Sequence, residues 1–222
     1  MKLKYGIITL MATFLFTLTA QAQNVFNEVS YSPRQTTFKL NAPKKPTLRI
    51  YEAGRGGNAI KKIKMKQTAE NVWEATVSGD LKGKFYTFDI GRGETPGVFA
   101  KAVGINGHRG AIIDMQTTNP SGWNSDHRLA LKSPADLIIY EMHHRDFSID
   151  PSSGLVNKGK FLALTEQKAI RHLKELGINA VHILPSFDFA SIDEANTTTP
   201  QYNWGYDPQN YNVPEGSYSF DA

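Results

Sequence analysis

The sequence predicts a multi-domain protein of the β plus α/β class, and three observations support this prediction. From about residue 26 to residue 115, apolar and polar residues alternate with a period of two, which is typical of strands with one buried face. Residues 117–134 are rich in Thr, Asn, Pro, Gly and Ser and form a predicted linker. From residue 135 the pattern becomes an apolar strand, an amphipathic helix and a second apolar strand. We therefore expect a β-sandwich followed by the start of an α/β domain.

The composition is that of an ordinary globular protein. The 222 residues are 40% hydrophobic and 21% charged, include no cysteine, and carry a formal net charge of +4. The hydrophobic content excludes a disordered chain, and the absence of cysteine excludes disulfides and thiolate metal sites. The positive excess is small, so a nucleic-acid partner is not expected.

Residues 1–22 form a predicted secretory signal peptide. Two lysines near the start precede an apolar run, Gly6–Leu18, which is shorter than the about 20 residues needed to span a bilayer. Ala20–Ala22 supplies an A-x-A cleavage site. We expect a secreted or periplasmic protein that begins at Gln23 and has no membrane association after cleavage.

Alternating runs mark the strands of the predicted sandwich, which we expect to occupy residues 23–116. The runs lie at residues 48–51, 61–66, 73–77 and 86–90, with glycine-containing turns at 53–57, 78–80 and 91–93. Short strands at this spacing, with no helical pattern between them, predict an immunoglobulin-like β-sandwich of about 90 residues. The lysines of the 61–66 run alternate with Ile63 and Met65, so we expect them on a solvated strand face.

The segment from residue 135 predicts a βαβ unit. Leu137–Tyr140 and Ala180–Leu184 are continuous apolar runs, as in parallel strands that are buried on both faces. Between them, Thr165 is the predicted N-cap of a helix that ends at Gly177. A crossover of this length makes the two strands parallel, and a long loop is expected after them. The spacing alone does not distinguish a barrel from an open sheet.

Several segments resemble glycoside hydrolases of the α-amylase superfamily. Residues 136–147 resemble the first barrel strand of these enzymes, and residues 172–189 resemble their first helix and second strand. Tyr202–Pro208, with the sequence YNWGYDP, is similar to the signature heptapeptide of type I pullulanases, and residues 210–218 continue as in that family. The sandwich resembles the carbohydrate-binding-type domain that precedes the barrel. The resemblance implies that residues 135–222 are the first two strands of an incomplete catalytic (β/α)8 TIM barrel.

The resemblance also implies a function. Pullulanases hydrolyse α-1,6-glucosidic branch linkages of pullulan, starch or glycogen with retention, which requires two carboxyl groups about 5–5.5 Å apart. In this family the catalytic carboxylates follow barrel strands four, five and seven, so we expect none of them in this chain and no activity from the chain alone. No cofactor is implied. The alternatives are a non-catalytic α-glucan-binding sandwich protein, or another superfamily member such as an isoamylase or branching enzyme.

Tyr206 and Asp207 are the predicted substrate-binding residues. The resemblance makes Tyr206 the loop tyrosine that stacks on the sugar ring beside the cleaved bond, and an aromatic face suits the apolar face of glucose. The alternative is a tyrosine that packs its own loop. Asp207 is expected either to accept hydrogen bonds from sugar hydroxyls or to fix the turn before Pro208.

Other residues that could carry chemistry are predicted to be structural. His143 and His144 end the first apolar strand but lack a third ligand at zinc spacing, so no metal site is expected. His182 lies within an apolar strand and is expected in the core. Trp123 lies in the predicted linker and has no assigned role. The remaining residues with predicted structural roles are Trp73, Tyr86, Glu141, Asp146, Asp188, Asn203 and Trp204.

Overall fold

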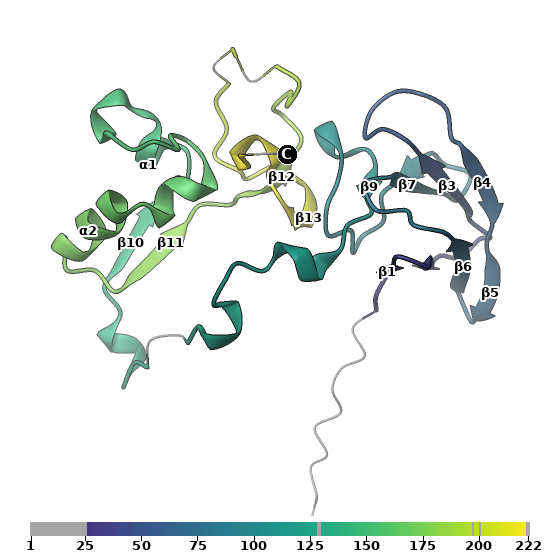
Figure 1. Cartoon of the computed structure of the whole chain (residues 1–222), viewed down its shortest axis with the longest axis horizontal. Helices are drawn as coiled ribbons and strands as arrows, with labels where there is room; N and C mark the ends of the chain where they lie inside the picture. Colours follow the sequence, from purple (N-terminus) through teal and green to yellow (C-terminus); the bar gives the residue numbers. More distant parts are fainter. Residues whose placement is uncertain (1–25, 128–129, 197, 200, 221–222) are drawn as a thin grey trace, which may run out of the picture.

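A computed structural model gives the fold of the chain (Figure 1). The structure describes residues 26–127, 130–196, 198–199 and 201–220, so the predicted signal peptide and its cleavage site lie outside the described residues. The antiparallel sheets lie within residues 29–111, and short helices mix with few strands after residue 134. This confirms the predicted change from β-structure to a mixed region.

The first sheet has the strand order β1-β2-β6-β5. Its longest pairing joins β2 to β6 over seven residues, from Gln35 opposite Ser78 to Asn41 opposite Val72. Because successive side chains of β2 and β6 point to opposite faces, those of Phe38, Leu40, Ala75 and Val77 lie in the core. The strand bounds are Val29–Ser32 for β1, Gln35–Asn41 for β2, Lys66–Ala69 for β5 and Val72–Ser78 for β6.

The second sheet has the order β4-β3-β7-β8, and β9 also pairs with β7. The predicted run at residues 61–66 is not one strand, because β4 belongs to this sheet and β5 to the other. Met65 makes the crossing between the sheets and is fully buried, while the neighbouring lysines are exposed as expected. The bounds are Thr47–Tyr51 for β3, Lys61–Lys64 for β4, Phe85–Asp89 for β7, Glu94–Thr95 for β8 and Gly110–Ala111 for β9.

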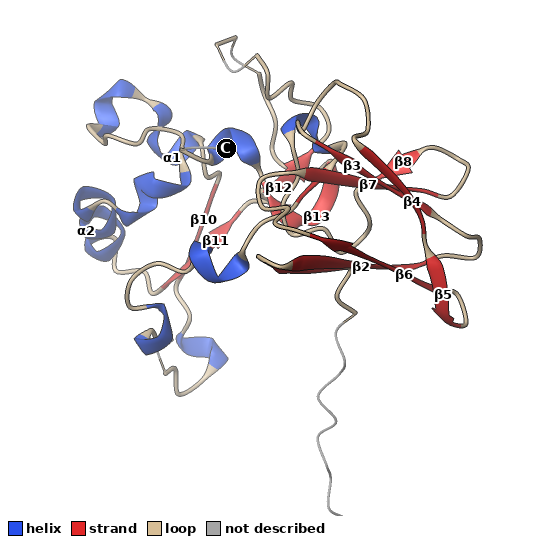
Figure 2. Cartoon of the chain, turned by 45° about the vertical axis from the view of Figure 1, so that its right-hand side comes forward, coloured by secondary structure: helices blue, strands red, loops and turns tan. Residues whose placement is uncertain are grey.

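The two sheets face each other across one apolar core (Figure 2). The ring of Phe38 lies 5.3 Å from that of Tyr86, measured between centroids, and 6.5 Å from that of Phe88. Trp73 packs against the same core and donates a hydrogen bond of 2.9 Å from its indole nitrogen to the Ala42 carbonyl. Tyr86 and Trp73 are therefore structural, as predicted, and the expected sandwich core is present.

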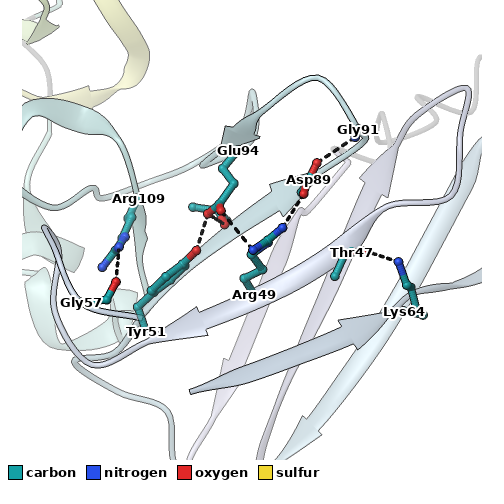
Figure 3. A network of polar contacts seen from close by, with 10 residues as sticks. Thr47, Arg49, Tyr51, Gly57, Lys64, Asp89, Gly91, Glu94 and Arg109 are labelled. Atoms are coloured by element: carbon teal, nitrogen blue, oxygen red, sulfur yellow. Dashed lines mark hydrogen bonds and ion pairs between the residues drawn. The ribbon is translucent and has the colours of Figure 1, made fainter. Parts of the chain in front are cut away.

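A polar network covers the outer face of the second sheet (Figure 3). The Arg49 guanidinium lies between two carboxylates, 2.6 Å from Asp89 and 3.4 Å from Glu94. Glu94 also accepts a hydrogen bond from the Tyr51 hydroxyl. Hydrogen bonds from the Gly91 amide and from Arg49 lower the pKa of Asp89, so this carboxylate is charged at neutral pH. The network ties β3, β7 and β8 together.

Arg109 extends this network to a loop at one end of the sandwich. Its guanidinium carbon lies 3.6 Å from the centre of the Tyr51 ring, a cation–π contact. The same side chain donates hydrogen bonds to three backbone carbonyls in the 53–57 turn. These contacts fix the loop of residues 104–109, which reaches the second half of the molecule.

The predicted linker contains only short 3₁₀ turns among its described residues. They are Met115–Thr118, Trp123–Ser125 and Pro134–Asp136. Ser133 and Asp136 form a reciprocal capping box that starts the last turn. Trp123 is 57% exposed and contributes to neither sheet.

The second half contains the predicted strand–helix–strand unit. Strands β10, Ile139–Met142, and β11, Ala180–Ile183, pair in parallel, with helices α1, Asp146–Ile149, and α2, Gln167–Glu175, between them in the chain. Gly177 follows α2 with a φ of +73° and donates to the Lys174 carbonyl, so it ends the helix as predicted.

The N-cap prediction is wrong. Thr165 ends a 3₁₀ turn, Phe161–Thr165, and its hydroxyl donates back to the Leu162 carbonyl at 2.8 Å. Glu166 therefore holds the N-cap position of α2, without a side-chain capping bond.

The predicted burial of the parallel strands is also wrong in this structure. Ile138 and Ile139 are 56% and 59% exposed, and Val181 is 39% exposed. His182, expected in the core, is exposed and lies 2.8 Å from the Glu141 carboxylate, measured from its Nδ1. The physical reason is that β10 and β11 form a sheet of two strands, so no further strand flanks them in the described residues.

The region expected to be a long loop contains a second antiparallel pair. Strand β12, Phe187–Phe189, pairs with β13, Pro208–Pro214, with irregular register. Val213 and Phe189 are buried, whereas most of the polar residues of β13 are exposed. The pair brackets the loop of residues 190–207, which carries most of the heptapeptide. In the described residues, no helix has the length and apolar character needed to cross a membrane.

Candidate functional site

A pocket of about 180 Å³ lies beyond the carboxyl end of β10. In parallel sheets, this is the edge where loops assemble binding sites. Segments that are far apart in the sequence line it. The lining includes His143, Arg145, Asp146, Lys158, Lys160, Tyr202, Asn203 and Tyr218. Two residues of the heptapeptide therefore line the pocket.

Polar contacts join the walls of this pocket. The His143 Nδ1 accepts from the Asp146 amide at 3.2 Å, and its Nε2 lies 3.4 Å from the Tyr218 hydroxyl. The Lys160 ammonium donates to the Ser217 carbonyl at 2.7 Å. Burial raises the pKa of Tyr218 to about 12, so this hydroxyl keeps its proton at neutral pH.

His144 is packed among aromatic rings. Its side chain is 3% exposed, and its ring centroid lies 4.6 Å from that of Phe161 and 5.5 Å from that of Tyr218. Burial lowers its pKa, so the ring is neutral at physiological pH. These contacts fit the structural role that the sequence predicts for it.

Side chains of the heptapeptide brace their own loop. The Asn203 amide nitrogen donates to the Ser191 hydroxyl at 2.6 Å and to the Asp207 carboxylate at 2.8 Å. The second Asp207 oxygen accepts from the Ser191 amide at 3.0 Å. Burial by itself raises the pKa of Asp207, but the hydrogen bonds outweigh it and lower that pKa. Both oxygens of Asp207 are thus engaged by other residues of the same loop.

Gly205 lets the heptapeptide pass close to the end of β11. Its φ is +84°, and a Cβ at this position would lie 1.8 Å from the Pro185 carbonyl oxygen. Glycine alone satisfies both constraints. Tyr206, the next residue, is 66% exposed and does not line the pocket described above. The structure therefore leaves the Tyr206 ring largely exposed and Asp207 partly exposed.

A cluster of three carboxylates lies next to this loop and is not evident from the sequence. Asp188 is in β12, Glu194 is in the loop, and Glu215 follows β13; one carboxylate oxygen from each lies within 4.8 Å of the others. Asp188 and Glu215 are 1% and 0% exposed. Burial raises the pKa of Asp188 and raises that of Glu215 to about 7, and the charge of Glu194 raises both further. The β12–β13 pairing brings together residues that are 27 positions apart in the chain.

The sandwich contributes to the same region through the 104–109 loop. Asn106 exchanges hydrogen bonds with Glu194 and donates to Asp193 at 2.9 Å. The Gly107 carbonyl accepts from the Asn210 amide at 3.1 Å. The sandwich lies beside the β12–β13 pair in Figure 1, and these bonds are among the contacts between them. The carboxylate cluster therefore lies where the two halves of the molecule meet.

Comparisons with known proteins point to one family. No protein-family model matches the chain. A pullulanase of Bacillus subtilis (strain 168) is 36% identical over 202 residues, which cover 85% of this chain and 27% of that protein. Isoamylase 3, chloroplastic, of Oryza sativa subsp. japonica is 38% identical over 108 residues, or 46% of this chain and 14% of that protein.

Solved structures agree with the sequence comparison. The apo pullulanase of Paenibacillus barengoltzii has a TM-score of 0.82 and 43% identity, and the match covers 87% of this chain and 32% of that chain. A structure of the same pullulanase in complex with maltohexaose and α-cyclodextrin matches equally well.

These matches extend beyond the segments that suggested the resemblance. The pullulanase match covers 85% of the chain and the isoamylase match 46%, so pullulanases account for more of it. The chain itself spans 27% of the B. subtilis pullulanase and 32% of the P. barengoltzii one. The resemblance predicted from the heptapeptide is confirmed: over most of its length, the chain matches a fragment of a type I pullulanase.

Proposed function

We propose that this chain is part of a retaining glycoside hydrolase that cleaves α-1,6-glucosidic branch linkages in pullulan, starch or glycogen. The observation that carries the proposal is the YNWGYDP loop, which Gly205 seats against the end of β11 with Tyr206 exposed. The pullulanase relatives support the reaction class. The neighbour in complex with maltohexaose and α-cyclodextrin supports an α-glucan as the ligand.

Within this proposal, the chain has four parts. Residues 1–22 are the signal peptide, 23–116 the carbohydrate-binding-type sandwich, and 117–134 the linker. Residues 135–222 are the first two strands of a (β/α)8 barrel, which the parallel pairing of β10 and β11 supports. The catalytic carboxylates follow later strands, so the chain alone releases no reducing sugar from pullulan. Debranching by the pure chain would contradict this assignment.

Tyr206 supplies the stacking face for a glucose ring in this proposal, and Asp207 is a positioning residue. An aromatic ring that is 66% exposed offers its face to the apolar side of a sugar. Asp207 sets the turn that presents this ring, because Asn203 and Ser191 already engage its oxygens.

The test compares substitutions in a full-length pullulanase that contains this chain. Tyr206→Ala lowers pullulan hydrolysis at least about tenfold, because a displacement of about 1 Å can cost about 10²-fold in rate. Tyr206→Phe keeps the ring and most of the activity. The control is Trp123→Ala, which removes an exposed aromatic ring outside the heptapeptide and leaves the rate unchanged. Wild-type kinetics in a folded Tyr206→Ala protein would contradict the stacking role.

The protein is also proposed to be secreted or periplasmic. The support is the predicted signal peptide in residues 1–22. Mass spectrometry of the exported protein is expected to give an N-terminus at Gln23, and a mature membrane-bound form that retains Met1 would contradict secretion.

A further inference from the structure

We propose that a cluster of six lysines on the sandwich binds phosphate monoesters carried by an α-glucan. The inference rests on the proposed function, because it adds a chemical class, the phosphorylated glucans, to the substrates named there. The members of this lysine cluster are Lys44, Lys45, Lys61, Lys62, Lys64 and Lys66.

Positive charge is concentrated in this part of the chain. Residues 44–66 contain eight basic side chains and a single acidic one, whereas the whole chain contains 25 and 21. All six lysines of the cluster are exposed. An exposed surface with charge of one sign attracts polymers of the opposite charge.

The fold gathers the lysine cluster around Met65, where the chain crosses from β4 to β5. Lys64 and Lys66 flank this residue in the sequence. The Met65 amide donates to the Pro46 carbonyl at 3.2 Å, and Pro46 directly follows Lys45. The backbone therefore holds two lysine-bearing segments side by side.

The loop that carries Lys44 and Lys45 is anchored at both of its ends. Beyond the bond to Pro46, the Ala42 amide donates to the Asn71 carbonyl at 2.8 Å, and the Ala42 carbonyl accepts from the Trp73 indole at 2.9 Å. A loop that is already ordered loses less conformational entropy when a ligand binds.

Acidic residues beside the lysine cluster are engaged with other cations. Glu74 lies opposite Lys66 in the β5–β6 pairing, but its carboxylate lies 3.4 Å from the Lys39 ammonium. Asp89 lies 2.6 Å from Arg49. Among the described residues, the salt bridges include none of the six lysines. Their charge is therefore not neutralised within the sandwich.

Protection of the sheet edges explains only part of this cluster. Strands β4 and β5 are end strands of their sheets, and lysines on such strands prevent pairing with another chain. Lys44 and Lys45, however, lie in the loop between β2 and β3 and not on an edge strand. Lysines that extend the positive surface beyond the edges favour a ligand.

The residue types favour phosphate on a flexible polymer. Lysine presents a compact charge on a flexible stem, whereas arginine suits bidentate recognition at fixed positions. Tyr51, the one aromatic residue in the segment 44–66, is 4% exposed, so this segment offers no stacking face for a neutral sugar. The ligand must therefore carry negative charge, and phosphate monoesters give a glucan about −1.5 to −2 per group at neutral pH.

The lysine cluster lies on the side of the sandwich that faces away from the second half (Figure 1). Strand β3 begins at Thr47, opposite Lys64, and ends beside the 53–57 turn that Arg109 holds. A branched glucan bound at the lysine cluster would be held away from the heptapeptide. Attachment at one point raises the local concentration of its other branches near the second point.

The experiment measures binding of the purified chain to amylopectin that carries phosphate monoesters, before and after phosphatase treatment, by affinity gel electrophoresis. We expect removal of the phosphate to lower the apparent affinity at least about tenfold, because several lysines act together. Raising the NaCl concentration from about 50 mM to about 500 mM is expected to have an effect of similar size, because salt screens exposed charges.

Two variants with the same loss of charge locate the binding surface. The first is expected to bind both amylopectin samples equally, and it combines Lys44→Gln, Lys45→Gln, Lys64→Gln and Lys66→Gln. The control replaces four exposed lysines elsewhere and is expected to keep the wild-type preference for phosphate; it combines Lys82→Gln, Lys132→Gln, Lys168→Gln and Lys174→Gln.

Three results would overturn the proposal. They are equal wild-type affinity for the two amylopectin samples, an equal loss of preference in both variants, and stronger binding to phosphatidylglycerol vesicles than to phosphorylated amylopectin. If the first variant does not fold, the comparison of the two samples decides by itself. Pullulan carries no phosphate, so its debranching by the full-length enzyme tests the proposed function independently of the lysine cluster.

Discussion

The sandwich and the parallel-strand unit differ in how much of their apolar surface they bury. In the sandwich, Phe38, Leu48, Ile50, Met65 and Phe88 are all 0% exposed. In the parallel-strand unit, a small cluster of Leu155, Ala163 and Ala169 is buried, while Ile138 and Ile139 on or beside β10 are more than half exposed. The sandwich closes its core with its own two sheets, whereas β10 and β11 leave apolar faces open.

This difference shows that an apolar sequence and a buried strand are separate properties. Burial of apolar area contributes about 25 cal/mol per Å², so an exposed strand loses most of that stabilisation. We therefore expect the sandwich to dominate the stability of the chain. Two experiments test this expectation, and a third examines a buried acid within the sandwich.

The largest effect is expected from a matched pair of isoleucine substitutions. Ile50→Ala removes a side chain that is 0% exposed and lowers the free energy of unfolding by about 2–5 kcal/mol. Ile139→Ala removes a side chain that is 59% exposed and changes it by less than about 0.5 kcal/mol. Urea unfolding followed by circular dichroism measures both values. Equal losses would show that β10 is covered in solution and would remove the contrast.

A second, smaller effect is expected in limited proteolysis. Segments with few buried apolar contacts open locally at low free-energy cost, so cleavage after residue 134 should be at least about tenfold faster than within the sandwich. Mass spectrometry of the products is expected to show a resistant core that ends between residues 116 and 134. Uniform resistance through residue 220 would show that the second half is as stable as the first.

The smallest effect concerns a buried acid in the sandwich. Glu28 is 2% exposed and accepts hydrogen bonds from the Val98 and Phe99 amides. Burial raises its pKa above 4.5, although these bonds and the charge of Lys101 oppose the shift. A raised pKa in the folded state means that wild-type stability is highest below the unfolded pKa and falls as pH rises through the folded pKa.

Glu28→Gln does not titrate, so it isolates this effect. We expect the melting temperature of the variant, relative to the wild type, to increase from pH 4 to pH 7.5. A difference that does not change with pH would show that ionised Glu28 is fully compensated inside the sandwich.

Most strands of the sandwich could be predicted, because each sheet has one buried face and its strands therefore alternate apolar and polar residues. The exception is the 61–66 run, where alternation continues through Met65 although the chain crosses from one sheet to the other. A local pattern records which side chains are buried, but it does not record which sheet a strand joins.

For the second half, the order of strands and helices could be predicted, but the burial of their side chains could not. The parallel pairing of β10 and β11 and the end of α2 at Gly177 are confirmed. The burial of the strands and of His182 depends on segments that pack against them, and the strand sequences contain no information about whether such segments are present. The N-cap prediction failed for a local reason, because the Thr165 hydroxyl donates to the Leu162 carbonyl of a 3₁₀ turn and does not cap α2.

Only the part of the candidate site that is formed by consecutive residues, the heptapeptide, could be predicted from the sequence. The heptapeptide marks Tyr206 and Asp207 directly, but it does not reveal that Asp207 is engaged by Ser191. The carboxylate cluster depends on the pairing of β12 with β13, whose exposed polar residues look like loop sequence. Its members therefore have no common motif.

The 104–109 loop limits which sandwich domains could replace this one by protein engineering. Asn106 and Gly107 both adopt left-handed backbone, with φ of 60° and 69°, and they contact Glu194 and Asn210 across the junction. Arg109 holds the same loop to the sandwich through the 53–57 turn. A foreign sandwich placed before this βαβ unit would therefore need more than a compatible linker. It would also need an Asn-Gly pair in the same left-handed conformation, held firmly enough to make the hydrogen bonds to Glu194 and Asn210.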